Sequence, residues 1–112
     1  MPESDAVFPG KEVVQVIELA SLETVEGTSA DHDVVLFALS TCPHCRHARE
    51  YLDKSGVAYR YVYVDQLQGA EQKDVMLACE KYNPNLTFPT LVVDDDNVII
   101  GFKESEYQER LS

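Results

Sequence analysis

The sequence predicts a single α/β domain. From residue 34 onward, short apolar runs typical of buried strands alternate with segments that have the apolar spacing of helices. A chain of 112 residues is long enough to bury its own core without disulfide cross-links. No apolar run approaches the roughly 20 residues that a membrane-spanning helix needs. We therefore expect one sheet flanked by helices.

The predicted elements follow the order strand, helix, strand, helix, strand, strand, helix. Their residue ranges are 34–39, 43–55, 58–64, 69–82, 89–93, 98–101 and 104–111. The first two strands are joined through a helix and should pair in parallel. Gly56 is placed to end the first helix as its cap. Residues 94–97, three aspartates and an asparagine, predict a hairpin turn between the last two strands.

Residues 1–33 form an acidic N-terminal extension, and residues 34–112 form the main domain. The extension holds eight acidic residues and one lysine, which gives −7 of the total charge of −11. Its apolar segment, residues 13–22, has some apolar spacing that fits a helix, but its β-branched content favours a strand that extends the sheet.

The overall charge and the N-terminal sequence limit the expected partners and location. A charge of −11 argues against nucleic acid and against anionic membranes as partners. Charged residues interrupt the start of the chain, where a signal peptide would be apolar, so we expect a cytoplasmic protein. We expect it to be a monomer.

The motif Cys42-Pro43-His44-Cys45 lies where the first strand gives way to the first helix. If Pro43 takes the first helical position, Cys42 becomes the N-cap and Cys45 the third helical residue. A Cys42 thiolate would then face free backbone N–H groups at the positive end of the helix dipole. Cysteines at this spacing can form an unstrained disulfide. The motif predicts a redox pair in which Cys42 attacks a disulfide and Cys45 resolves it.

The residues around the motif leave alternatives open. A protonated His44 would lower the pKa of Cys42, but an exposed polar residue without that role fits the position equally well. Arg49 is expected on a solvated helix face, and the alternating tyrosines of residues 59–63 are expected to pack. Cys79, in the second helix, is expected to be semi-buried and without a redox role.

Metal binding is the main rival interpretation of a Cys-x-x-Cys pair. A structural zinc site needs four ligands, and the chain has no second cysteine pair and no zinc-finger spacing of histidines. We therefore predict no metal in the redox site. A metal or iron-sulfur carrier that uses Cys42 as a ligand stays as the alternative function.

Residues 87–90 form a second motif, Thr-Phe-Pro-Thr. A proline at the start of a buried strand needs a reason, because it cannot donate to the sheet. A cis bond between Phe88 and Pro89 would supply one, and it would present the Phe88 backbone to an extended substrate. A trans proline that simply opens the strand is the other interpretation.

Residues 39–45, 87–90 and 100–102 together resemble a glutaredoxin-like redoxin of the thioredoxin-fold superfamily. The resemblance covers residues 34–112. It implies a thioredoxin-like fold, with a four-stranded mixed sheet and flanking helices in the order βαβαββα. It also implies thiol-disulfide oxidoreductase activity that needs no cofactor beyond the Cys42–Cys45 disulfide. The residues implied to bind substrate are Thr87, Phe88, Pro89 and Gly101.

The sequence departs from the common glutaredoxin pattern around this site. His44 stands where these proteins commonly have tyrosine, Leu39 and Ser40 stand where a basic residue is common, and Phe102 replaces the second of two glycines. These departures count against glutathione as the electron donor. The predicted activity is therefore a protein-disulfide reductase that a reductase or another small thiol regenerates.

Overall fold

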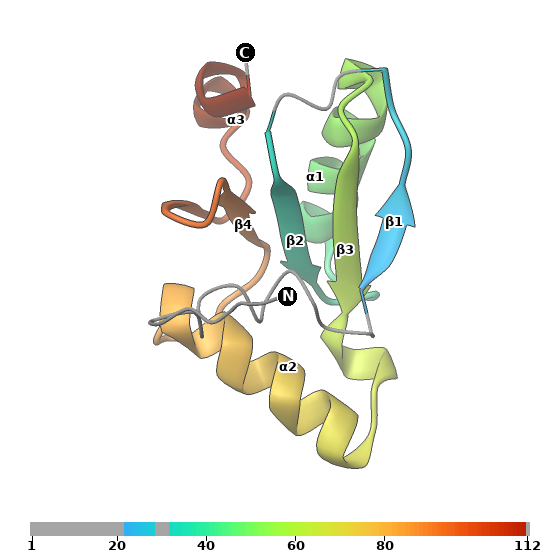
Figure 1. The fold of residues 1–112 in the computed structure, drawn as a ribbon, viewed down its shortest axis with the longest axis vertical. Helices are drawn as coiled ribbons and strands as arrows, with labels where there is room; N and C mark the ends of the chain where they lie inside the picture. Colours follow the sequence, from blue (N-terminus) through green and yellow to red (C-terminus); the bar gives the residue numbers. More distant parts are fainter. Residues whose placement is uncertain (1–21, 29–31, 112) are drawn as a thin grey trace, which may run out of the picture.

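The computed structural model describes residues 22–28 and 32–111, which form a mixed sheet with helices on both faces. The strands are β1 (Glu23–Val25), β2 (Val34–Ala38), β3 (Tyr59–Tyr63), β4 (Thr90–Val93) and β5 (Asn97–Ile100). Their order in the sheet is β1-β3-β2-β4-β5 (Figure 1). β2 and β3 pair in parallel, and the other three pairs are antiparallel. The predicted mixed sheet is confirmed.

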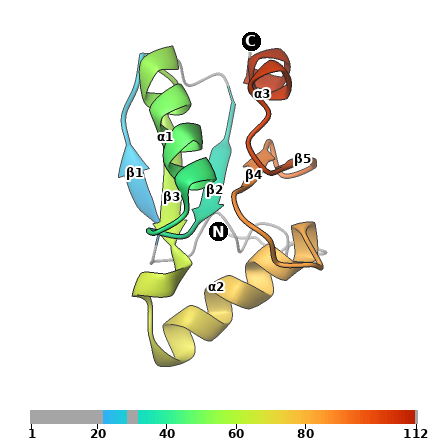
Figure 2. The ribbon, with the colours of Figure 1, turned by 180° about the vertical axis from the view of Figure 1, so that it is seen from behind.

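The helices are α1 (Pro43–Ser55), the 3-10 turn η2 (Val64–Gln66), α2 (Gly69–Tyr82) and α3 (Glu104–Leu111). Alternate residues of a strand face opposite sides of a sheet, so β2 contributes to two hydrophobic cores. Leu36 packs in the core with α1 and α3, while Phe37 packs in the core with α2. Figure 2 shows α1 in front of the sheet and α2 crossing its lower end.

The predicted elements of residues 34–112 are all present. The three helices have the predicted bounds, and the strands differ by a residue at some ends. β4 begins at Thr90 and not at Pro89, because proline has no N–H for the ladder. Gly56 caps α1 in the left-handed conformation, with φ of 73°. The hairpin turn follows β4, where Asp94 also has a positive φ.

The N-terminal extension adds an edge strand. β1 pairs antiparallel with β3, with Glu23 opposite Tyr61. The predicted strand at residues 13–22 lies outside the described residues, apart from Leu22. At the end of the extension, Gly27 passes so close to α1 that a Cβ there would lie 2.5 Å from the Gly56 carbonyl oxygen. The division of the chain near residue 33 stays a prediction.

Within residues 22–28 and 32–111, no helix is both long enough and apolar enough to cross a membrane.

Candidate active site

Cys42 lies at the N-terminus of α1, in the place that the sequence predicts. It is the N-cap, with extended backbone, and Pro43 takes the first helical position. The Cys42 carbonyl accepts the first helical hydrogen bond, from the Arg46 N–H at 3.1 Å. The Cys42 side chain makes no cap hydrogen bond. Cys42 is partly exposed and can be reached by a substrate.

Cys45 lies behind Cys42 and is fully buried. Its Sγ accepts a hydrogen bond from the Leu39 N–H at 3.4 Å, which ties it to the end of β2. Burial raises the pKa of Cys45 to about 12, and the neighbouring Cys42 adds to this effect. Cys45 is therefore a thiol at neutral pH. The two cysteines, close in sequence, differ in their access to solvent.

Asp65 and Ser40 fix the loop that leads to Cys42, a contact that the sequence analysis missed. The Asp65 carboxylate accepts hydrogen bonds from the Ser40 hydroxyl and from the Ser40 N–H, the latter at 2.9 Å. These bonds hold the pKa of Asp65 below its usual value. The predicted parallel pairing of the first two strands was a signal for this contact, because the residues that follow two parallel neighbours meet at the same end of the sheet.

The Thr87–Pro89 segment lies at the same end of the sheet as Cys42. Thr90 pairs with Phe37 near the end of β2, so the residues before Thr90 lie beside the loop that follows β2. The Phe88–Pro89 peptide bond is cis, which is one of the two interpretations of the sequence. Pro89 accepts a hydrogen bond from the Gly101 N–H at 2.8 Å, which brings the predicted residue Gly101 beside it.

Asn83 holds this segment in place, and the sequence analysis did not identify it. It follows the last residue of α2 and is fully buried. Its Nδ2 lies 2.9 Å from the Thr87 carbonyl oxygen, 3.0 Å from the Thr87 Oγ1 and 2.9 Å from the Thr90 Oγ1. The asparagine between α2 and the proline-containing segment was a weak sequence signal for this role. The sequence did not identify its partners, because they lie four and seven residues later, beyond a turn.

Basic and aromatic side chains surround the exposed part of the motif. His44, Arg46 and His47 are exposed on the first turns of α1, which have no acidic residue. The His47 ring meets Phe102 edge to face, with 6.4 Å between ring centroids. The effect of His44 on the Cys42 pKa stays a prediction.

Arg49 is not on a solvated helix face, and that prediction is wrong. Its guanidinium lies over the Tyr61 ring, 3.9 Å from the centroid, and donates to the hydroxyls of Tyr59 and Tyr63 at 3.1 Å each. Burial lowers the pKa of Arg49, but the two tyrosine hydrogen bonds raise it more, so it stays charged. The three tyrosines face α1 because they alternate along β3, and the Arg49 guanidinium packs against them.

Cys79 is more buried than predicted. It is fully buried between α2 and the sheet, and burial raises its pKa to about 11. It has no access to a substrate at the surface. Among the described residues, no three His, Cys, Asp or Glu side chains are grouped so that they could hold a metal ion.

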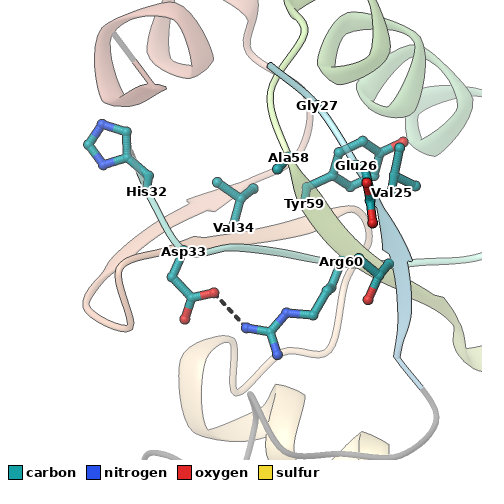
Figure 3. Close-up of a pocket in the computed structure, with 10 residues that line it drawn as sticks. Val25, Glu26, Gly27, His32, Asp33, Val34, Ala58, Tyr59 and Arg60 are labelled. Carbon is teal, nitrogen blue, oxygen red and sulfur yellow. Dashed lines mark hydrogen bonds and ion pairs between the residues drawn. The ribbon is translucent and has the colours of Figure 1, made fainter. Parts of the chain in front are cut away.

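A surface hollow lies at the opposite end of the sheet from the cysteines. Figure 3 shows it between the first residues of β2, the start of β3 and the end of β1. Three of the residues that line it have charged or ring partners: Asp33 pairs with Arg60, and the His32 ring lies 2.7 Å from the Asp94 carboxylate. The hollow plays no part in the chemistry of Cys42.

A Cys-x-x-Cys pair at the start of a helix, beside a cis-proline segment in this sheet, defines a thiol-disulfide oxidoreductase of the thioredoxin-fold superfamily. The glutaredoxin family model matches residues 34–98, and the chain belongs to the glutaredoxin family.

Three similar proteins illustrate this family membership. A Rickettsia bellii glutaredoxin 1 is 30% identical over 69 residues, which cover 60% of this chain and 67% of the relative. The crystal structure of a Methanosarcina mazei glutaredoxin is 36% identical, with a TM-score of 0.74, and the match covers 82% of this chain and 88% of the other. Methanoredoxin from Methanosarcina acetivorans is 35% identical, with a TM-score of 0.69 and coverages of 71% and 84%.

Proposed function

We propose that this protein reduces disulfides of other proteins by a dithiol mechanism, in which Cys42 attacks and Cys45 resolves. The observation that carries the proposal is the asymmetry of the two thiols. Cys42 is accessible at a helix N-terminus, whereas Cys45 is buried and protonated. Only Cys42 can meet a disulfide in solution, and only Cys45 lies close enough to displace what Cys42 has captured.

The reaction proceeds in two exchanges. The Cys42 thiolate attacks one sulfur of the substrate disulfide, the substrate S–S bond breaks, and one substrate thiolate leaves and takes a proton. Cys45 then loses its proton, and its thiolate attacks Cys42 Sγ in the mixed disulfide. The second substrate thiolate leaves, the substrate has gained two electrons, and the protein carries a Cys42–Cys45 disulfide.

Thr87, Phe88, Pro89 and Gly101 are the proposed substrate-binding residues. Their support is their position, since residues 87–89 and Gly101 lie together at the end of the sheet where α1 begins. An extended substrate strand would pair with the Phe88 backbone as with a sheet edge. Recognition through the backbone accepts many sequences, which suits a general protein-disulfide reductase.

Variants of the two cysteines test the mechanism. Cys45→Ser should still attack a disulfide substrate and should then accumulate as a stable mixed disulfide, detected by mass spectrometry. Cys42→Ser should be inactive, although it keeps Cys45. Cys79→Ser, which retains both motif cysteines, is the matched control and should turn over normally. An active Cys42→Ser variant would contradict the proposed roles.

The electron donor is proposed to be a reductase or a small thiol. A buckwheat glutaredoxin with this fold is known as a complex with glutathione, but its identity of 15% shows the fold alone. The uncharged Leu39 and Ser40 count against glutathione here. Rates of reduction of the oxidised protein by glutathione, by thioredoxin reductase and by a ferredoxin-linked reductase identify the donor. Iron-sulfur binding through Cys42 stays a prediction, which the colour of anaerobically purified protein tests.

A further inference from the structure

Asn83 connects the end of α2 to the segment that precedes β4. Its backbone N–H donates to the Cys79 carbonyl at 2.9 Å, and its own carbonyl accepts from the Leu86 N–H at 2.9 Å. Its side-chain oxygen accepts from the Asn85 N–H at 3.2 Å. The orientation of the Asn83 amide follows from these bonds: Oδ1 faces the Asn85 N–H donor, and Nδ2 faces the three acceptor oxygens of Thr87 and Thr90.

The amide of Asn83 holds both ends of the Thr87–Thr90 segment. Two amide hydrogens serve the Thr87 carbonyl and the hydroxyls of Thr87 and Thr90. The Thr90 hydroxyl in turn donates to the Thr87 carbonyl at 2.8 Å, which closes the network. Asn83 and Thr90 are both completely buried, so water cannot replace a lost bond.

The backbone before this segment needs such a support. Leu86 has a φ of 53°, in the left-handed region that residues with a Cβ rarely adopt. Its N–H is bonded to Asn83, so the same residue stabilises this conformation. The Leu86 bond goes to the Asn83 backbone carbonyl, and the Asn83 side chain adds the bonds that tie this turn to Thr87 and Thr90.

We propose that Asn83 is a positioning residue that determines how well the protein accepts extended substrates. Its side-chain amide holds residues 87–89 in the path that a substrate strand pairs with, beside Cys42. The hydrogen bonds of Asn83 reach neither Cys42 nor Cys45, so loss of its side chain should leave the reactivity of Cys42 unchanged. The inference rests on the proposed function, because it assigns Asn83 a part in substrate binding.

The test compares two substrates in Asn83→Asp, which keeps the size of the side chain and removes its two hydrogens. One substrate is an extended peptide that contains a disulfide, and the other is bis(2-hydroxyethyl) disulfide, which is too small to pair with the backbone. We expect kcat/KM for the peptide to fall about tenfold, mainly through KM, because misplacement of a binding segment weakens orientation of the substrate. The rate with the small disulfide should change less than about twofold on the same reasoning.

Thr90→Val provides a second variant in case Asn83→Asp folds poorly. It removes one member of the network and keeps the shape of the side chain, so it should show a smaller selective loss of the peptide reaction. Asn97→Asp is the matched control, because the Asn97 amide donates to Asp96 in the exposed hairpin. It should change neither substrate. Equal losses for both substrates, or no loss for either, in both network variants would overturn the inference.

Amide hydrogen exchange gives a readout that does not depend on activity. Exchange in residues 85–88 should be faster in Thr90→Val and Asn83→Asp than in Asn97→Asp, by about tenfold or more if one buried hydrogen bond of about 1–1.5 kcal/mol is lost. Unchanged exchange overturns the inference, whatever the enzyme assays show. A wild-type protein that reduces no peptide contradicts the proposed function alone, since the exchange result still decides the structural role of Asn83.

Discussion

Raising the pH from 7 to 10 should accelerate the resolving step steadily, because that step needs the Cys45 thiolate. Burial raises the pKa of Cys45 from 9.0 to about 12. At pH 7 the thiolate is then about one part in 100,000, against about one part in 100 for a thiol of pKa 9. The contribution of Cys42 to this shift disappears once Cys42 is in a mixed disulfide, but burial is the larger cause and remains. The rate should rise about tenfold for each pH unit, without a plateau up to pH 10.

Reaction of the reduced protein with excess dithio-bis-nitrobenzoate isolates this step. The first thionitrobenzoate is released when Cys42 attacks, at a rate proportional to the reagent concentration. The second is released when Cys45 displaces it from Cys42, at a rate independent of that concentration. Stopped-flow absorbance therefore measures resolution alone. Cys45→Ser should show the first release and lack the second.

A resolving rate that begins to level off near pH 9 would refute the reasoning. It would mean that Cys45 ionises like an exposed thiol, so that its burial in the core with α1 and α3 does not control its chemistry. A rate already flat at pH 7 would contradict the protonated state of Cys45 at neutral pH altogether.

Three further substitutions test contacts around the site. Arg49→Ala should lower the free energy of unfolding by about 1–3 kcal/mol, because it removes two charged hydrogen bonds and a stacking contact over Tyr61, and urea unfolding measures this loss. Arg49→Lys, which keeps the charge without the planar fork, should lose less; equal stability of both variants and the wild type would contradict the contact. Tyr107→Phe should leave stability unchanged or raise it by about 1 kcal/mol, because the buried Tyr107 hydroxyl has no hydrogen-bond partner among the described residues; a loss above 1 kcal/mol would show that the hydroxyl has one. Asp65→Asn should lower the free energy of unfolding at pH values above 3.8, the ordinary pKa of aspartate. In the wild type this stabilisation is lost as the pH falls through the lower pKa that Asp65 has in the folded protein. Acid unfolding curves of the two proteins should therefore converge at low pH, and a constant gap down to full protonation would exclude ionisation of Asp65 as the cause.

The strands and helices of the main domain followed from local sequence. The apolar runs and the helix signals at Pro43 and Gly56 determine structure within a few residues, so the helix bounds were predicted without error. The N-cap position of Cys42 followed in the same way. The cis bond before Pro89 was one of two interpretations from local sequence.

The side-chain contacts that join separate segments could not be predicted in this way. Arg49 looked like a surface residue, because the sequence does not show that three tyrosines of β3 lie beneath it. Asn83 and Asp65 looked like ordinary polar residues at the ends of elements. Their partners depend on which strands become neighbours and on the register between them, which many distant contacts set together.

The sequence by itself determined the chemistry of this protein: a Cys-x-x-Cys pair at the start of a helix, in an α/β domain, that exchanges thiols with disulfides. Spacing along the chain suffices for that, because residues 42–45 are close together in any fold that makes the helix. Only the tertiary structure decided how the two thiols differ and what supports them. Burial of Cys45 depends on the packing of α1 and α3 against the sheet, and the support of residues 87–90 depends on Asn83 meeting residues that follow it after a turn.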